Sequence, residues 1–495
     1  MIANGTFRYR TLFKDTIIYG TGRYTSQIIG IFILPIYTKL FSPHDYGIIE
    51  ILNTFLFISG YLVIAGTDTA LRAYYYKEGD ENKRKELAFT TIMLQTLSSL
   101  AFALLFLKLS PSILKLFSLN SETSPIFKIA VLNLIPLAIF VSCQEILKLK
   151  FKPISYSVVS IGEVILVYSL SLYLIIGQKM GIKGYFLGKL VADSFFAVVA
   201  LITAIKHIKP RFSLSICKAL VTFGFFILIA QILAMISSTD RFMLARYADL
   251  SRIGIYAIAI KLCSLVALFT TAFLTAWGPT SMSIQSQGNA KDIYYRVLRY
   301  YSAFILSIAF YLGLFSREIL HLLVQPSFWE AYKYVGFLGY SMGVESLVHI
   351  VNVGLLIKDK PSKSALAVGV SSIFNLIMFM LLIPKLGIAG AVISLLATKF
   401  LLVTVSAYVA GKYYRIEWHV SKIARIFLIN LAFYPIFLFF EISRDGLNIF
   451  LKLIIATAYI ITILASGVFV RSDLERFRNR MPSKAKLFDY ISTKT

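Results

Sequence analysis

Two stretches of this chain share one layout: FKPISYSVVSIGEVILVYSLSLYLIIGQKMGIKG, residues 151–184, and DKPSKSALAVGVSSIFNLIMFMLLIPKLGIAG, residues 359–390. Each has Lys-Pro near its start, an apolar run in its middle and a Gly-Ile-X-Gly tetrad at its end. The prolines are 208 residues apart and the tetrads are 206 residues apart. The shared layout therefore indicates an internal repeat of about 207 residues.

A third pair of segments fits the same register. Residues 39–47, which contain Ser42 and Asp45, correspond to residues 246–254, and Gly47 lies 207 residues before Gly254. Three landmarks in one register predict two related halves. In a chain that is mostly membrane-spanning, such halves are typical of transporters.

Composition indicates a membrane protein, because 58% of the residues are hydrophobic and the mean hydropathy is +0.75. A span needs about 20 apolar residues. The weakest span that we predict, 300–320, carries Arg317 and Glu318. The fourteen predicted spans are 12–38, 48–70, 88–108, 126–147, 154–177, 185–205, 216–238, 253–277, 300–320, 332–356, 364–384, 387–410, 423–441 and 448–470.

The even number of spans in each half predicts a parallel repeat, in which both halves have the same orientation. The predicted fold is an all-α polytopic membrane protein of about fourteen transmembrane helices, with two pseudo-symmetric six-helix bundles in a V. Its parts are an N-terminal bundle at 1–210, a C-terminal bundle at 211–415, transmembrane helices 13 and 14 at 416–470, and a basic tail at 471–495.

The charge distribution predicts the orientation. The chain has 50 Lys and Arg against 25 Asp and Glu, a formal net charge of +25. With the N-terminus inside, we assign about 32 of the basic residues to cytoplasmic segments, as the positive-inside rule requires. Both termini are then cytoplasmic. The basic runs are explained as topology signals beside anionic lipid, so they do not predict nucleic-acid binding.

Charged residues inside predicted spans are costly, about 2.5–3.5 kcal/mol each at the bilayer centre. Local pairing explains some of them. Lys189 with Asp193, and Asp68 with Arg72, are four residues apart and predict salt bridges on one helix face. Lys399 and Glu145 are expected to reach the membrane interface from near a span end.

Arg23 and Lys261 are different, because neither has an acid three or four residues away. We expect both to face a cleft between the bundles, where cations suit an anionic substrate. The alternative is that each pairs with an acid on a neighbouring helix and only holds the bundle together. Asp68, Glu345 and His349 are candidates for carrying a coupling proton or sodium ion.

Two sequence blocks resemble a known family. The first comprises LFKDTIIYGTGRYTSQIIGIFILPIYTKLFSPHDYGIIEIL at 12–52 and GTDTALRAYYY at 66–76. The second comprises TDRFMLARYADLSRIGIYAIAIKL at 239–262 and AWGP at 276–279. They resemble the bacterial polysaccharide transporters, which are the lipid-linked oligosaccharide flippases of O-antigen, capsule and exopolysaccharide assembly. These belong to the multidrug/oligosaccharidyl-lipid/polysaccharide exporter superfamily.

The resemblance implies a flippase of the bacterial inner (cytoplasmic) membrane that translocates undecaprenyl-pyrophosphate-linked oligosaccharide by alternating access. It assigns substrate binding to Arg23 in YGTGR and to Lys261 in GIYAIAIK, and gating or a structural role to Asp240 and Arg241. Helices 13 and 14 are expected to form a groove for the polyprenyl tail. A polysaccharide polymerase and a chain-length regulator are the implied protein partners.

Two alternatives come from other classes. A drug or small-molecule cation antiporter of the same superfamily shares the bundles but usually lacks the last two spans. A membrane enzyme on the same lipid carrier is expected to show a long outer loop or a soluble domain. The longest connections here hold only about 15 to 20 residues, too few to bury a core. No Gly-rich ATP-binding loop is present in the sequence, so we do not expect the chain itself to use ATP. Because the outer loops are short and the five histidines are scattered, we predict no enzyme activity, and we predict no metal or cofactor.

Overall fold

The computed structural model describes residues 25, 27–236, 239–285, 287–358, 360, 362–433 and 445–468. Helices and turns make up these residues, and no β-strand occurs among them. In the same part of the chain, eleven helices or continuous helix runs are long and apolar enough to cross a membrane. They coincide with the second to the twelfth predicted spans. The all-α class is therefore confirmed, and the chain is a multi-pass membrane protein.

The elements of the first half follow from capping signals and apolar runs. Ser42 and Asp45 form a capping box that starts α3, and Pro43 and Pro153 occupy the first turns of α3 and α9. The elements are α2 (Leu34–Leu40), α3 (Pro43–Ile64), α4 (Thr67–Tyr75), α5 (Glu81–Lys108), α6 (Ser110–Leu116), η1 (Ser121–Thr123), α7 (Ser124–Leu132), α8 (Leu134–Leu149), α9 (Pro153–Leu172), η2 (Tyr173–Gly177), α10 (Gly181–Ala204) and η3 (Ile205–His207).

The second half repeats this order at nearly constant offset. After α11 (Leu214–Met235) come α12 (Asp240–Tyr247), α13 (Leu250–Ile284), α14 (Ala290–Leu314), α15 (Ser316–Leu323), η5 (Pro326–Ala331), α16 (Tyr332–Ser346), α17 (Val348–Val351), α18 (Val353–Ile357), α19 (Ser362–Leu386) and α20 (Ile388–Tyr413). Even the short α6 has its counterpart in α15, whose first residue lies 206 positions later. The repeat in the sequence is thus a repeat of elements.

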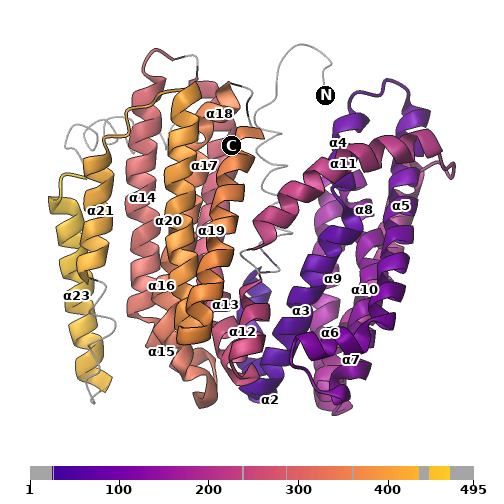
Figure 1. Cartoon of the computed structure of the whole chain (residues 1–495), viewed down its shortest axis with the longest axis horizontal. Coiled ribbons are helices and arrows are strands. Elements are labelled where there is room, and N and C mark those ends of the chain that lie inside the picture. The colour runs from indigo at the N-terminus through magenta and orange to yellow at the C-terminus, as the bar shows by residue number, and fades with distance from the viewer. Residues whose placement is uncertain are drawn as a thin grey trace, which may run out of the picture.

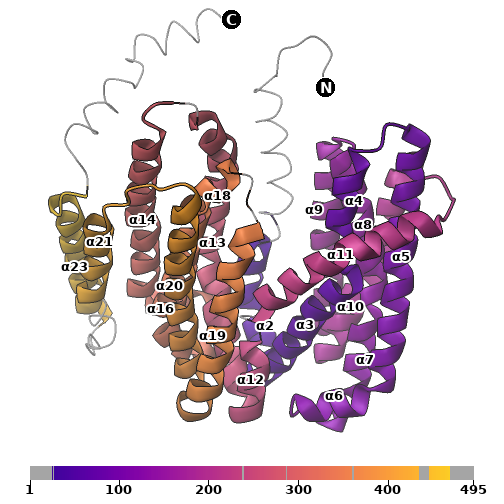
Figure 2. The ribbon, with the colours of Figure 1, turned by 45° about the horizontal axis from the view of Figure 1, so that its top comes forward.

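The helices form two groups (Figure 1). In the first bundle, α10 packs against α8 and α9, and α5 against α8. In the second bundle, α16 packs against α13, α14 and α20, and α19 lies along α20. The groups meet at the end that holds α2 and α12, which we call the crossing end (Figure 2). The opposite end we call the basic end, because Lys150, Lys152, Lys358 and Lys412 lie there.

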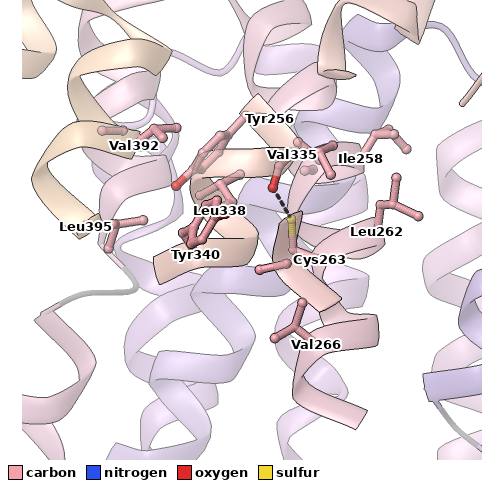
Figure 3. Packing of buried hydrophobic residues seen from close by; sticks show 14 of the residues in the cluster. Tyr256, Ile258, Leu262, Cys263, Val266, Val335, Leu338, Tyr340, Val392 and Leu395 are labelled. Atoms are coloured by element: carbon pink, nitrogen blue, oxygen red, sulfur yellow. Dashed lines mark hydrogen bonds between the residues drawn. The ribbon is translucent and has the colours of Figure 1, made fainter. Parts of the chain in front are cut away.

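The core of the second bundle is built on one face of α13. Figure 3 shows Cys263 of α13 beside Val335 of α16, with Leu338 of α16 and Val392 of α20 further along the same side, and all four are buried. The Cys263 thiol donates to the Val335 carbonyl oxygen at 3.1 Å and is fully buried. This packing fixes the rotation of α13, and with it the direction of the residues on its other faces.

α11 connects the two bundles. It runs obliquely across the molecule in both views and contacts α4 and α5 of the first bundle and α19 of the second. The sequence assigned this span to the C-terminal part that begins at 211. Its contacts on both sides make it a link between bundles rather than an ordinary member of one.

A last pair of helices, α21 (Val420–Phe433) and α23 (Asp445–Ala465), packs beside α14 at the edge of the second bundle. The contact is partly polar: Asn430 Oδ1 accepts from Tyr459 at 3.0 Å and also from Tyr340. The ring of Tyr459 stacks on Phe310 with centroids 4.0 Å apart. These helices correspond to predicted spans 13 and 14, while most of the first predicted span lies outside the described residues.

One predicted span is displaced. The ninth was expected at 300–320, but α14 occupies Ala290–Leu314, and Arg317 and Glu318 lie in the separate helix α15. The first two turns of α14 contain Lys291, Asp292 and Arg296, which hide the start of the helix from a hydropathy window. Glu318 is paired with Lys452 of α23, whose Nζ lies 2.7 Å from a Glu318 carboxylate oxygen.

Candidate functional site

The two bundles touch where α3 and α13 cross. A Cβ atom added to Gly47 would lie 2.1 Å from the Leu250 carbonyl oxygen, and one added to Gly254 would lie 2.0 Å from that of Pro43. Gly47 faces Leu250, and Gly254 faces Pro43. Pro43 and Leu250 are equivalent positions of the repeat, because they are 207 residues apart, as Gly47 and Gly254 are. The crossing is a pseudo-two-fold contact of backbone on backbone, which a side chain at either glycine would prevent.

An ion pair spans the bundles beside this crossing. Arg241 of α12 places Nε 2.7 Å from Glu50 Oε1 of α3, and the two side chains are 14% and 22% exposed. The neighbouring Asp240 stays within the second bundle, where it accepts from the Tyr256 hydroxyl and from the Arg241 backbone N–H. Asp240 therefore holds α12 to α13, and Arg241 holds α12 to the first bundle.

Lys261 lies on α13 beyond the crossing, two turns or about 10 Å after Gly254. A Cβ atom added to Gly30 would be 2.9 Å from Lys261 Nζ and 3.2 Å from the Tyr168 hydroxyl. The ammonium group thus reaches from the second bundle to Gly30 and Tyr168 of the first. Within the described ranges, no acid forms an ion pair with Lys261. Arg23, the other predicted cleft cation, lies outside the described residues.

A chain of tyrosines in the first bundle begins at Tyr168, beside Lys261. The Tyr37 ring centroid lies 6.1 Å from that of Tyr168 and 5.7 Å from that of Tyr185. Asn53 of α3 donates from its side-chain amide to the Tyr185 hydroxyl at 3.1 Å. A polar strip therefore runs from Lys261 across three tyrosines to α3. The sequence reasoning missed this strip, and its only local signal was a lone asparagine in an apolar span.

Several other charges in the spans are paired with a charge of opposite sign. The predicted bridges are confirmed: Lys189 Nζ lies 3.1 Å from Asp193, and Arg72 lies 2.6 Å from Asp68. The interface expectation for Lys399 is wrong, because its Nζ is bound to Glu345 at 2.8 Å and its side chain is only 12% exposed.

Glu145 does not reach the interface either. Its side chain is 9% exposed and lies 2.6 Å from Lys148 and 3.7 Å from Arg72. In both cases a charge of opposite sign replaces water as the partner of the buried group, while the partner itself stays partly exposed: Glu345 by 46%, Lys148 by 40% and Arg72 by 49%.

The three candidate ion carriers do not form one site. Asp68 lies on α4 beside Arg72, whereas Glu345 on α16 and His349 on α17 belong to the second bundle. Only Glu345 and His349 are neighbours, four residues apart on consecutive short helices. Over the described part of the chain, no group of three His, Cys, Asp or Glu side chains is placed to hold a metal ion.

A long apolar groove lies between the second bundle and α21. Its volume is about 690 Å³, and its walls come from α16, α20 and α21, with Leu298 of α14 and Trp418 of the loop before α21. Phe337, Phe400 and Phe427 are among the lining residues. The groove is therefore suited to hydrocarbon rather than to a charged group.

Known proteins share this fold, and a protein-family model matches the sequence. A family model described as "polysaccharide biosynthesis protein" matches residues 36–333. No curated protein sequence matches the chain.

Among solved structures, the lipid II flippase MurJ in an inward closed conformation is similar with a TM-score of 0.71 at 16% identity, covering 92% of this chain and 100% of that one. A point mutant of the Vibrio cholerae MATE transporter VcmN gives 0.59 at 16% identity, covering 82% and 97%. An outward-facing multidrug resistance MATE transporter of the MOP superfamily gives 0.59 at 12% identity, covering 84% and 96%. The fold is that of these transporters, and the chain belongs to the polysaccharide biosynthesis protein family.

Proposed function

We propose that this protein is a flippase that moves undecaprenyl-pyrophosphate-linked oligosaccharide across the bacterial inner membrane by alternating access. The observation that carries the proposal is Lys261, a cation of the second bundle that has no ion pair in the described chain and whose ammonium lies against Gly30 of the first bundle. Phosphate oxygens are good partners for such a cation. Arg23, on the first predicted span, is proposed as a second cation for the same head group.

The apolar groove supports a lipid substrate rather than a soluble one. A pyrophosphate with several sugars cannot enter hydrocarbon, while its polyprenyl tail must remain there. The groove beside α21 offers the tail an apolar surface at the edge of the second bundle. The head would then travel between the bundles while the tail follows along the groove.

The proposed orientation places the basic end in the cytoplasm, with both termini, according to the positive-inside rule. The crossing end then faces outward. In this arrangement the Gly47–Gly254 contact and the Glu50–Arg241 pair close the outer side. Arg241 is thus proposed as a gate residue that separates from Glu50 when the outer side opens, and Asp240 as the gate residue that keeps α12 attached to α13.

The proposal keeps the division into two bundles at 1–210 and 211–415, a helix pair at 416–470 and a tail at 471–495. Asp68, Glu345 and His349 stay candidates for ion coupling. A polymerase and a chain-length regulator are the proposed partners of the pathway, and no bond of the substrate changes during transport.

The testing experiment is the amount and sidedness of undecaprenyl-pyrophosphate-linked oligosaccharide in a deletion strain. We expect accumulation on the cytoplasmic face and loss of surface polysaccharide, with both restored by the wild-type gene. Normal surface polysaccharide without accumulation, in a strain that has no second flippase, contradicts the proposal. The drug-antiporter alternative, which the MATE likeness supports, then takes its place.

A further inference from the structure

A second, smaller pocket of about 310 Å³ opens in the first bundle between α3, α8 and α10. One stripe of α3 forms its long wall, with Asn53, Phe57, Gly60 and Tyr61 at helical spacing. The volume is at the lower end of the range of small-molecule sites, about 300–1,000 Å³. The pocket therefore has room for one ring-sized group rather than for a whole oligosaccharide.

Its polar wall has unused hydrogen-bonding capacity. Asn133, only 2% exposed, donates from Nδ2 to Asp193 at 2.8 Å, while its Oδ1 has no hydrogen-bond partner among the described residues. Asn53, on the facing wall, uses its amide N–H toward Tyr185. A buried acceptor without a partner is unfavourable, and a small shift of the pocket wall would let a ligand hydroxyl supply the missing hydrogen bond.

The charge in the pocket is compensated. Lys189 lines the pocket, but its ammonium is bound to Asp193 at 3.1 Å. A free phosphate would have to compete with Asp193 for Lys189, and a drug cation would meet a carboxylate that is already paired. The wall thus favours a neutral group with many hydroxyls over either kind of ion.

The opposite side of the pocket is aromatic. The rings of Phe57 and Tyr61 lie edge to face with centroids 5.2 Å apart, and Phe57 is 51% exposed. Gly60 lies between them along α3, and the nearest atom to a Cβ added there is Leu137 Cδ2 at 3.7 Å. An apolar ring face beside amide groups matches a sugar ring, which has C–H faces and hydroxyl edges.

We propose that this pocket is a sugar subsite that recognises one monosaccharide of the lipid-linked head group. The proposal rests on the proposed function. It gives the two bundles different tasks: Lys261 of the second engages the pyrophosphate, and the α3–α8–α10 pocket of the first recognises the sugar. The strip of Tyr168, Tyr37 and Tyr185 links the two, because Asn53 belongs to both the strip and the pocket.

The test compares two probes on purified protein in lipid nanodiscs. One is undecaprenyl pyrophosphate without sugar, and the other is the undecaprenyl-pyrophosphate-linked oligosaccharide isolated from the deletion strain. Gly60→Leu fills the pocket, and Tyr61→Ala removes its ring without adding bulk. Gly411→Leu on α20 is the matched control, since nothing lies within 4 Å of a Cβ there. Thermal unfolding verifies that each variant is folded.

We expect Gly60→Leu and Tyr61→Ala to weaken binding of the glycosylated probe by about tenfold, the effect of about 1.4 kcal/mol, and to leave the sugar-free probe unaffected. The control should bind both like the wild type. If a folded variant binds both probes equally more weakly, or binds the glycosylated probe as strongly as the wild type, the subsite is overturned and the proposed function is not. If the wild type binds neither probe, the proposed function fails and the subsite with it.

Discussion

Helices α3 and α13 begin alike and end differently. Both start at the crossing, where Gly47 and Gly254 meet, but α13 continues for 35 residues to Ile284 whereas α3 stops at Ile64. Ala65 and Gly66 come directly after α3 with φ of 49° and 70°, and α4 then starts in a new direction. The repeat thus preserves the contact between the bundles but not the course of the helix beyond it.

The break in α3 makes room for α11. A Cβ atom added to Gly66 would lie 2.6 Å from the Gly224 carbonyl oxygen, and one added to Gly224 would lie 2.4 Å from that of Ala65. Among the described residues, two contacts therefore bring a glycine of one segment against a glycine of another. One, between α3 and α13, is symmetric, while the other, between the α3–α4 break and α11, occurs in the first half and has no glycine at the equivalent position, which is Phe273.

The largest effect is expected at the symmetric contact. Gly47→Ala and Gly254→Ala should each abolish transport, because the added Cβ forces apart two backbones that have no flexible group between them; overpacking alone costs about 1–3 kcal/mol. Complementation of the deletion strain measures this, with Gly411→Ala as the control. Similar losses at both glycines support the pseudo-symmetric contact, and tolerance at one of them contradicts it.

The next effect tests Lys261, which lies past the crossing on the uninterrupted helix. Lys261→Ala should reduce transport by about 10–100-fold at normal membrane levels, because a hydrogen bond to a charged group contributes about 1.5–3 kcal/mol. Lys261→Arg should retain most activity. Loss of the protein from the membrane instead of transport would indicate a structural role.

A smaller effect is expected at the asymmetric contact. Gly66→Ala places a side chain in the left-handed region, which costs about 1–2 kcal/mol, and crowds the α11 backbone. Thermal unfolding of the purified protein should therefore show a lower midpoint than in the wild type, with Gly411→Ala again as the control. An unchanged midpoint for Gly66→Ala would show that α11 moves away without loss of stability.

The smallest effect concerns the Glu50–Arg241 pair. Arg241→Gln removes the cation that faces Glu50, and Glu50→Gln leaves Arg241 with only its 3.5 Å contact to Asp240, so a double-mutant cycle should give a coupling of about 1 kcal/mol. The exchange Glu50→Arg with Arg241→Glu should restore part of the transport lost in the single variants. Purely additive single effects would remove the pair from the gate.

Patterns in the local sequence predicted the helices and the repeat well, but they predicted few of the contacts between helices. Gly47 and Gly254 were visible as landmarks of a repeat, yet nothing in either neighbourhood indicates that they touch each other. Lys189 with Asp193 was predictable because the partners share a helix face. Two ion pairs join helices that are far apart in the sequence: Arg241 with Glu50, and Lys399 with Glu345. Helical periodicity cannot predict such pairs, because it relates only residues of the same helix.

The candidate site likewise has one part that the sequence predicted and one that it did not. Lys261 was singled out because a cation without a local acid is conspicuous in an apolar span, and the structure places it between the bundles. The pocket beside Asn133 was not predicted, because it exists only where one stripe of α3 meets two helices from about 80 to 140 residues further on. Neutral polar residues on separate helices give no common signal in sequence.

The oblique course of α11 has a mechanical consequence. This helix of 22 residues is about 33 Å long, close to the thickness of a hydrocarbon core of about 30 Å, and much of its surface is apolar and exposed, with Leu214 at 77% and Phe226 at 70%. Much of the surface of the element that joins the bundles is therefore open to lipid. A thicker bilayer favours a more upright α11 and a thinner one a more tilted α11, so acyl-chain length acts directly on the angle between the two halves.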